Sequence, residues 1–170
     1  LEFRRVLFRS LQTMSKFRRL AESHQVDRIE AVATSAVREA ENGGEFLKAI
    51  VEQTGIRARI ISGTEEARLI HLAAAYGLDL SDGRNVTVDI GGGSVEITHG
   101  TGPSITEGRS FKLGVIRLTE RFVTTDPLSE RDERRMVRFI ENELKAYLKP
   151  IREAGFDRVV GTSGSILSID

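Results

Sequence analysis

The sequence predicts an α/β protein in which mixed sheets are flanked by helices. In the first half of the chain, short runs rich in β-branched or small residues alternate with amphipathic helical stripes, which is the rhythm of a parallel sheet. Further along, three strand-like runs are joined by short turns, and this pattern predicts an antiparallel meander. Two turns rich in glycine and serine each follow a short strand, where α/β sheets place their ligands.

The composition is that of an ordinary globular protein. Of the 170 residues, 39% are hydrophobic and 29% are charged, and 25 Lys and Arg balance 25 Asp and Glu. This balance favours neither a nucleic acid nor a membrane surface as partner. The absence of cysteine excludes disulfides and thiolate metal sites and is consistent with a cytoplasmic protein. No apolar run approaches the about 20 residues that cross a membrane, and no signal peptide is visible.

Apolar spacing and capping residues define the elements expected in the first half. Residues 1–10 mix arginines with apolar residues without clean periodicity, so we expect them to be disordered or foreign to the natural fold. The elements that follow are a helix at 11–23, a strand at 29–34, a helix between Gly44 and Gly55, a strand at 56–61 and a helix at 65–76 capped by Thr64. The last helix is apolar on most sides, which predicts burial between two layers. The polar segment 78–85 is the expected domain boundary.

The second half is expected to open with a hairpin and to close with another glycine turn. Its elements are two strands within 86–98, a third near 105–113, a short helix at 115–122, a long helix opening at Ser129 and a strand from Asp157. Ser129 and Asp132 resemble a capping box, and Pro150 is expected to kink or end the long helix. The charges at 131–135 predict a solvated face.

The stretch at 86–98 is the most specific feature of the chain. Asp89 and an apolar run precede three glycines, and a serine and a second apolar run follow them. Because glycine has no Cβ, Gly91, Gly92 and Gly93 can take positive φ and let an anion approach successive N–H groups. Asp89 stands where a carboxylate can hold the divalent cation of phosphate chemistry. A plain hairpin needs no ligand, but three glycines exceed what such a turn requires.

Two further features point to phosphate. A second glycine turn, at 161–164, follows another β-branched run, and both turns meet a common cleft if their strands lie side by side in one sheet. Arg38 follows the first expected strand and is therefore a candidate phosphate contact. Pairing of Arg38 with Glu39 or Glu41 is the alternative.

Four motifs together resemble the exopolyphosphatase and guanosine pentaphosphate phosphatase family. They lie at 61–70, 89–96, 111–114 and 161–165. That family belongs to the actin, Hsp70 and sugar-kinase superfamily, whose two ribonuclease-H-like lobes clasp phosphates between them. The resemblance covers residues 11–170, and it implies that 11–79 forms the C-terminal part of the first lobe and 80–170 the N-terminal part of the second.

The resemblance implies a role for each matching residue. Glu66 matches the catalytic glutamate, which positions and deprotonates the water that attacks the terminal phosphorus, and Arg38 matches an arginine that holds the phosphate chain. Asp89 and Glu96 match acidic residues associated with Mg²⁺. The phosphate-binding matches are Gly91, Gly92, Gly93 and Ser94 in the first turn and Gly161, Ser163 and Gly164 in the second. Strand alternation alone puts Glu96 on the face opposite to Asp89, unless the turn resets the phase.

The implied activity is hydrolysis of a terminal phosphoanhydride. The substrate is inorganic polyphosphate or guanosine pentaphosphate, a nucleotide of the stringent response, with Mg²⁺ as cofactor and no nucleic-acid or membrane partner. A homodimer of the full-length protein is compatible with the resemblance. The family's first phosphate loop, an Asp-Ile-Gly motif on an early strand, has no match before Asp89. We therefore expect this chain by itself to be weakly active or inactive.

Other interpretations stay open at this point. Glu65 and Glu66 in the first turn of a helix favour its dipole and need no catalytic role. The same loops can serve an ATP-dependent phosphotransferase or ATPase of the superfamily. A noncatalytic nucleotide- or polyphosphate-binding module is the alternative outside the enzymes. His24, His71 and His99 are isolated, and we expect them to be structural or surface residues.

Overall fold

The computed structural model describes residues 2–168, with side chains from Phe8 onward. The chain forms two compact units, residues 1–62 and 63–170. The division comes before helix α4 (Gly63–Gly77) and not in the polar segment 78–85, because α4 packs on the sheet of the second unit.

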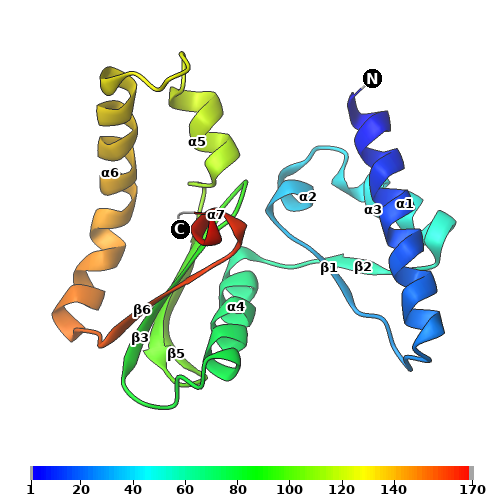
Figure 1. Ribbon diagram of the computed structural model, residues 1–170, viewed down its shortest axis with the longest axis horizontal. Coiled ribbons are helices and arrows are strands. Elements are labelled where there is room, and N and C mark those ends of the chain that lie inside the picture. The colour runs from blue at the N-terminus through cyan, green and yellow to red at the C-terminus, as the bar shows by residue number, and fades with distance from the viewer. Residues whose placement is uncertain (1, 169–170) are drawn as a thin grey trace. The chain divides into compact units, whose positions relative to one another are not determined.

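The first unit is a two-stranded parallel sheet with three helices (Figure 1). It contains, in order, α1 (Glu2–Ser23), β1 (Ala31–Ala33), α2 (Ser35–Glu39), α3 (Gly43–Thr54) and β2 (Ala58–Ile60). The strands run parallel as predicted, with Val32 opposite Arg59. Leu11 of α1 packs with Ile50 of α3 and with Ile56 in the core of this unit.

Two helix ends in the first unit bear on the sequence predictions. Gly55 closes α3 as predicted: it takes a left-handed conformation, with φ 68°, and donates its N–H to the carbonyl of Val51 at 2.9 Å. Helix α1 begins at Glu2 and so includes most of the segment 1–10, and the expectation that this segment is disordered or foreign to the natural fold stays a prediction. Leu1 lies outside the described residues.

The second unit is built on a four-stranded mixed sheet (Figure 1). Its strands are β3 (Arg84–Ile90), β4 (Val95–Thr101), β5 (Ser104–Phe111) and β6 (Arg158–Thr162), in the order β5-β4-β3-β6. The first three form the predicted antiparallel meander, and β6 joins the other side of β3 in parallel. The remaining helices are α5 (Val115–Phe122), α6 (Glu130–Ala154) and α7 (Gly164–Leu167).

Strand β4 is buried on both faces, and the two faces differ in chemistry. Val95 and Ile97 belong to the same apolar core as Tyr147 of α6. Because side chains alternate along a strand, Glu96 and Thr98 point to the other face, which α4 covers. The polar side chains of the sheet therefore gather beneath α4, and this arrangement positions the candidate site.

Helix α4 buries one face and exposes the other. Its buried residues are Ala67, His71, Ala74 and Ala75. Leu69 is 36% exposed and Tyr76 is 78% exposed, so the predicted burial between two layers is not found. The number of apolar residues in α4 suggested burial on all sides. It did not show that the buried face consists of three alanines and one histidine.

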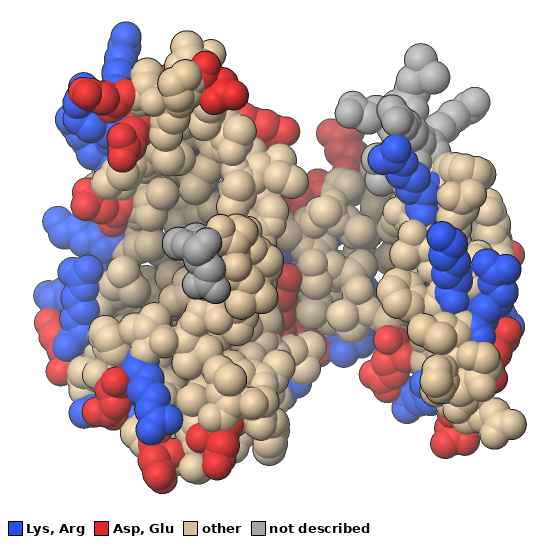
Figure 2. Space-filling model, in the orientation of Figure 1, with Lys and Arg blue, Asp and Glu red and all other residues tan. Residues whose placement is uncertain are grey.

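Helix α6 begins with the predicted cap and a charged first segment. Ser129 Oγ accepts a hydrogen bond from the N–H of Asp132 at 3.2 Å. The side chain of Asp132 is buried and does not complete a capping box, because its Oδ2 accepts from Thr124 Oγ1 at 2.6 Å. The remaining charges at 131–135 are exposed, and Figure 2 shows side chains of both signs interspersed over this part of the second unit. They form the predicted solvated face.

Pro150 lies inside α6 and does not end it. The helix continues to Ala154, and Gly155 then donates its N–H to the carbonyl of Ile151 at 3.0 Å. Tyr147 and Ile151, on either side of the proline, are both buried in the core. Tertiary packing therefore outweighs the backbone hydrogen bond that a proline removes. Among the described residues, no helix combines the length and apolar character needed to cross a membrane.

Candidate functional site

The two glycine turns lie beside each other, as the sequence predicted for adjacent strands. β3 and β6 are parallel neighbours, with Asp89 opposite Thr162. Thr162 Oγ1 donates to Asp89 Oδ1 at 2.8 Å, and Ser163 Oγ donates to the carbonyl of Ile90 at 2.7 Å. Both turns therefore follow the carboxyl ends of neighbouring strands, where open α/β sheets bind ligands.

The second turn holds a strained residue. Ser163 takes φ 74° and ψ 165°, a conformation that costs a non-glycine residue about 1–3 kcal/mol. Its hydroxyl bond to Ile90 helps to hold this conformation. Gly161 is needed for packing, since a Cβ there would lie 2.7 Å from Cγ2 of Ile166. A Cβ on Gly164, by contrast, would meet no atom within 4 Å.

The triple-glycine turn does not use positive φ, and this corrects the expectation from the sequence. Gly91, Gly92 and Gly93 are absent from the glycines with positive φ. Close approach constrains Gly114, because a Cβ there would collide with the backbone carbons of Gly92 and Gly93, and a Cβ on Gly92 would lie 3.0 Å from Cδ1 of Ile116. The turn closes through the N–H of Gly91, which donates to the carbonyl of Ser94 at 3.0 Å.

All three glycine carbonyls are tied to the start of α5. The N–H groups of Val115 and Ile116 donate to the carbonyls of Gly91 and Gly92 at 3.0 and 2.9 Å. Arg117 Nε donates to the carbonyl of Gly93 at 3.1 Å. In a trans peptide the C=O and the next N–H point in opposite directions, so the amides of residues 92–94 face away from α5. Among the turn, loop and cap hydrogen bonds of the described residues, the amides of residues 92–94 donate to no backbone carbonyl.

The two predicted metal ligands lie on one face of the sheet. Asp89 and Glu96 are direct partners across β3 and β4, and directly opposed residues of an antiparallel pair point to the same side. The four-residue turn at 91–94 therefore resets the alternation that separates the two residues in the sequence. Ser110 on β5 is the next partner of Glu96 and lies on the same face.

Glu96 is a buried carboxyl with an altered pKa. Its side chain is 2% exposed, and its Oε1 accepts a hydrogen bond from Ser110 Oγ at 2.6 Å. Burial raises the pKa of Glu96, hydrogen bonds from Ser110 and Ser94 lower it in part, and the carboxylates of Glu66 and Asp89 raise it further. Glu66, in the first turn of α4, is thus close enough to Glu96 to affect its ionisation.

A buried histidine fastens α4 to the sheet. His71 is fully buried, with Nδ1 2.8 Å from Thr98 Oγ1 and Nε2 2.9 Å from the carbonyl of Gly102. Because a carbonyl only accepts, Nε2 carries the proton and Nδ1 accepts from the Thr98 hydroxyl. Burial lowers the pKa of His71, which favours this neutral form. His71 is therefore structural, as predicted, and it sits on the helix that carries Glu66.

Arg38 belongs to the first unit. It lies on α2, directly after β1, and its Nη1 donates to the carbonyl of Ile61 at 2.8 Å. This bond holds the side chain near the end of β2. The remaining predicted residues, from Glu66 to Gly164, belong to the second unit.

The donor set near Asp89 fits Mg²⁺ without forming a complete cage. Among the described residues, no group of three His, Cys, Asp or Glu side chains is arranged to hold a metal. Mg²⁺ usually keeps several waters and takes one or two carboxylates together with substrate phosphates. Asp89 and Glu96, two carboxyls on one face, are the oxygen donors that such a site needs.

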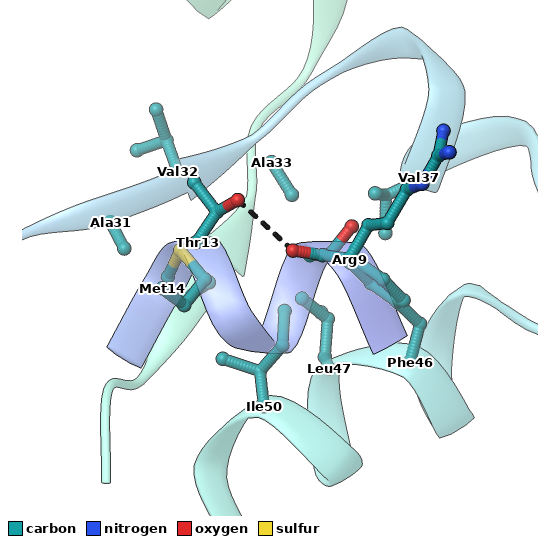
Figure 3. A pocket seen from close by; sticks show the side chains of 12 residues that line it. Arg9, Thr13, Met14, Ala31, Val32, Ala33, Val37, Phe46, Leu47 and Ile50 are labelled. Carbon is teal, nitrogen blue, oxygen red and sulfur yellow. Dashed lines mark hydrogen bonds between the residues drawn. The ribbon is translucent and has the colours of Figure 1, made fainter. Parts of the chain in front are cut away.

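A separate pocket in the first unit has a different character. It has a volume of about 430 Å³, and most of its lining is apolar, as Figure 3 shows for Met14, Val37 and Phe46. The hydrogen bond drawn there joins Thr13 Oγ1 to the carbonyl of Arg9 at 3.0 Å. An apolar lining of this kind does not suit a polyanion.

Sequence reasoning missed four residues that shape this site. They are Thr162, Ser110, His71 as the tether of α4, and Arg117. Each acts through a partner that is distant in the chain, so no local pattern marks it. Two of them did have a nearby signal, because Thr162 lies within the motif at 161–165 and Arg117 closely follows the motif at 111–114.

Comparison with known sequences identifies relatives over nearly the whole chain. A profile described as the Ppx/GppA phosphatase family matches residues 4–169. Exopolyphosphatase 1 of Mycobacterium leprae (strain TN) is 34% identical over 160 residues, which cover 94% of this chain and 47% of the relative. Exopolyphosphatase 1 of Mycobacterium tuberculosis (strain ATCC 25618 / H37Rv) is 33% identical, with 94% and 46% covered.

Solved structures share the fold. The crystal structure of the Aquifex aeolicus member of the Ppx/GppA family has a TM-score of 0.77 at 34% identity and covers 94% of this chain and 50% of that one. An exopolyphosphatase from Cytophaga hutchinsonii has a TM-score of 0.90 at 32% identity, with 95% and 52% covered. The expected fold class, α/β of the actin-like ATPase type, is confirmed. The chain spans about half the length of the relatives that it matches. It belongs to the Ppx/GppA phosphatase family.

Proposed function

We propose that this chain forms part of an exopolyphosphatase, which hydrolyses the terminal phosphoanhydride bond of inorganic polyphosphate. One observation carries the proposal: Asp89 and Glu96 share a sheet face at the end that carries the triple-glycine turn with its outward amides, and Glu66 is near enough to Glu96 to raise its pKa. Phosphoanhydride hydrolysis requires a positioned water and neutralisation of spreading negative charge, with little covalent chemistry. Carboxyls beside preorganised amides meet both requirements.

Glu66 is the carboxylate best suited to act as the base. It is half-buried, whereas Glu96 is 2% exposed and is bonded to the Ser110 hydroxyl. In this role a Glu66 oxygen takes a proton from water while the water oxygen bonds to the terminal phosphorus and the bridging P–O bond breaks. A well-placed base contributes about 10²–10⁴-fold to the rate.

Backbone amides and one arginine provide the stabilisation of charge. The amides of residues 92–94 are directed by the tethered carbonyls, so they need no reorganisation when an anion arrives. Ser163 and Gly164 add backbone groups from the adjacent turn, and the Ser163 hydroxyl holds the two turns together. Arg38 belongs to the first unit, and its contact with the phosphate chain stays a prediction from the family resemblance.

Asp89 and Glu96 are the residues assigned to Mg²⁺. Their shared sheet face and the orientation of Asp89 by Thr162 support this assignment. When bound, Mg²⁺ neutralises charge on the phosphate oxygens. The raised pKa of Glu96 fits a carboxyl that becomes more acidic when a cation is beside it.

The test is single-turnover phosphate release by this chain at high protein concentration, with polyphosphate, ATP and guanosine pentaphosphate as substrates. We expect Mg²⁺-dependent release from polyphosphate, weak because the chain spans about half of its relatives. Guanosine pentaphosphate presents the same type of terminal bond and is therefore the competing substrate in the assay. Preferential release from ATP would contradict the proposal.

Glu66→Gln separates catalysis from binding. The substitution should abolish phosphate release and leave the dissociation constant for tripolyphosphate nearly unchanged, because Gln keeps the size of the side chain but cannot take the proton. Glu65→Gln, at the neighbouring position, is the matched control and should retain release. Unchanged turnover in Glu66→Gln would remove this residue from the role of base.

A further inference from the structure

The triple-glycine turn needs an external restraint to present its amides. Glycine peptides rotate readily because no Cβ limits φ and ψ. If the peptide between Gly93 and Ser94 rotated, its carbonyl would point to the anion in place of the N–H. A carbonyl oxygen repels a phosphate, so the same turn can favour or oppose an anion depending on the orientation of its peptides.

The start of α5 supplies that restraint through three hydrogen bonds. Two come from backbone amides, those of Val115 and Ile116. These donors would otherwise be the unsatisfied N–H groups of a helix start, so the helix and the turn satisfy each other. The third comes from a side chain, Arg117 Nε, and it holds the carbonyl of Gly93 at 3.1 Å.

We propose that Arg117 is a positioning residue that fixes the peptide between Gly93 and Ser94, so that the Ser94 amide faces the phosphate. The role rests on the proposed phosphate site. Arg117 is half-buried, which favours a fixed side chain, and its bond to Gly93 spans 24 residues of sequence. Ser94 is also buried and bonds to Glu96, so the restraint on this peptide reaches the carboxyl group as well.

Positioning and direct attraction by charge can be separated with three variants. Arg117→Gln places an amide nitrogen at the same distance along the side chain as Nε, so it keeps a donor for Gly93 and removes the charge. Arg117→Lys keeps the charge but puts its donor one atom further out. Arg117→Met removes both. Arg138→Met, on an exposed part of α6, controls for the general loss of one positive charge.

The experiment is a titration of the chain with tripolyphosphate in Mg²⁺, followed by the ¹⁵N-amide signals of residues 92–94. We expect Arg117→Met to weaken binding about tenfold, the scale of one lost hydrogen bond, and Arg117→Gln to stay near wild type. The Ser94 signal of the unliganded Met variant should also broaden or shift, while signals from β6 stay in place. Arg138→Met should bind like wild type.

Each other outcome overturns a specific statement. One such outcome is that Arg117→Lys binds nearly as well as wild type while Arg117→Gln binds as weakly as Arg117→Met. This would show that the charge of Arg117 attracts the phosphate directly and that the positioning role is wrong. If all three variants bind tripolyphosphate as tightly as wild type, Arg117 has no role in the site, and the proposed function still stands. Absence of binding by the wild type would instead contradict the proposed function itself. If Arg117→Met fails to fold, the comparison of Gln with Lys still decides.

Discussion

Asp89 and Glu96 face each other directly across the β3–β4 hairpin, although seven positions separate them in the sequence. Two carboxyls on one sheet face repel each other when both are ionised, and burial of Glu96 adds to the cost of its charge. The arrangement is unfavourable for an empty fold and favourable for one that binds a cation. If the pair holds Mg²⁺ as proposed, stability and function make opposite demands on it.

Glu96→Gln should stabilise the fold at neutral pH. The folded pKa of Glu96 lies above its unfolded value, so this group favours folding below about pH 4.5, and the contribution is lost as pH rises through the folded pKa. Gln keeps an oxygen that accepts from Ser110 but carries no charge. Thermal unfolding between pH 4.5 and 8 should show a gain over wild type that grows with pH.

The control for that series is Glu143→Gln on an exposed part of α6, which should show no such growth. The stabilised Glu96→Gln variant should also lose the effect of Mg²⁺ on tripolyphosphate binding. A gain in stability that is constant across the pH range would contradict the raised pKa.

Substitution of His71 should change how stability depends on acid. The folded pKa of His71 is lowered, so the unfolded chain binds more protons just below pH 6.5, and stability falls as pH drops from there toward the folded pKa. His71→Gln should cost about 1–3 kcal/mol at pH 7.5, because buried partners in Thr98 and Gly102 lose a good contact. The substitution should also make the loss of stability below pH 6.5 less steep.

Urea unfolding at pH 5, 6 and 7.5 measures this effect. His24→Gln is the matched control, since His24 is exposed. An equal acid decline in wild type and His71→Gln would assign the decline to other groups.

Gly114→Ala should displace the triple-glycine turn at 91–93. A methyl group at this position meets the backbone of Gly92 and Gly93, which cannot move aside without breaking the tethers to α5. Overpacking of this kind costs about 1–3 kcal/mol. We expect a lower unfolding midpoint and weaker tripolyphosphate binding in the same variant.

Gly77→Ala is the control for Gly114→Ala, because a Cβ on Gly77 has no neighbour within 4 Å. It should leave binding unchanged. Normal binding by a destabilised Gly114→Ala would show that the turn tolerates displacement.

Thr162→Val tests how Asp89 is oriented. The valine keeps the shape of threonine but removes the hydroxyl that donates to Asp89 Oδ1 at 2.8 Å. Stability should fall by about 1 kcal/mol, and more Mg²⁺ should be needed for half-maximal tripolyphosphate binding. Thr106→Val, at an exposed position of β5, should change neither quantity. An unchanged Mg²⁺ requirement would separate Asp89 from the metal.

Local patterns predicted the elements well, and long-range packing accounts for what they missed. The meander, the closing residue Gly55 and the cap at Ser129 follow from spacing and turn chemistry, and the structure confirms them. The passage of α6 through Pro150 depends on core contacts on both sides of the proline, which no window of sequence contains.

The candidate site shows the same division. Its glycine turns and acidic residues were proposed from the sequence, and their roles stay predictions. That Asp89 and Glu96 share a sheet face could not be predicted, because it depends on how the four-residue turn pairs the two strands. The tether from Arg117 to Gly93 joins residues from different elements and has no periodic signal. Positive φ was expected for Gly91, Gly92 and Gly93, but none of them adopts it, and the closest backbone contact at this turn constrains Gly114 instead.

Strand β4 presents apolar side chains to the core that contains α6 and ionisable or hydroxyl side chains to α4. Its odd and even positions therefore tolerate different substitutions. Insertion or deletion of a single residue in the bend before it would exchange the two sets at once. A carboxyl group would then be driven against Tyr147 while valine and isoleucine took its place under α4. This hairpin should therefore tolerate many substitutions in its sequence but few changes in its length.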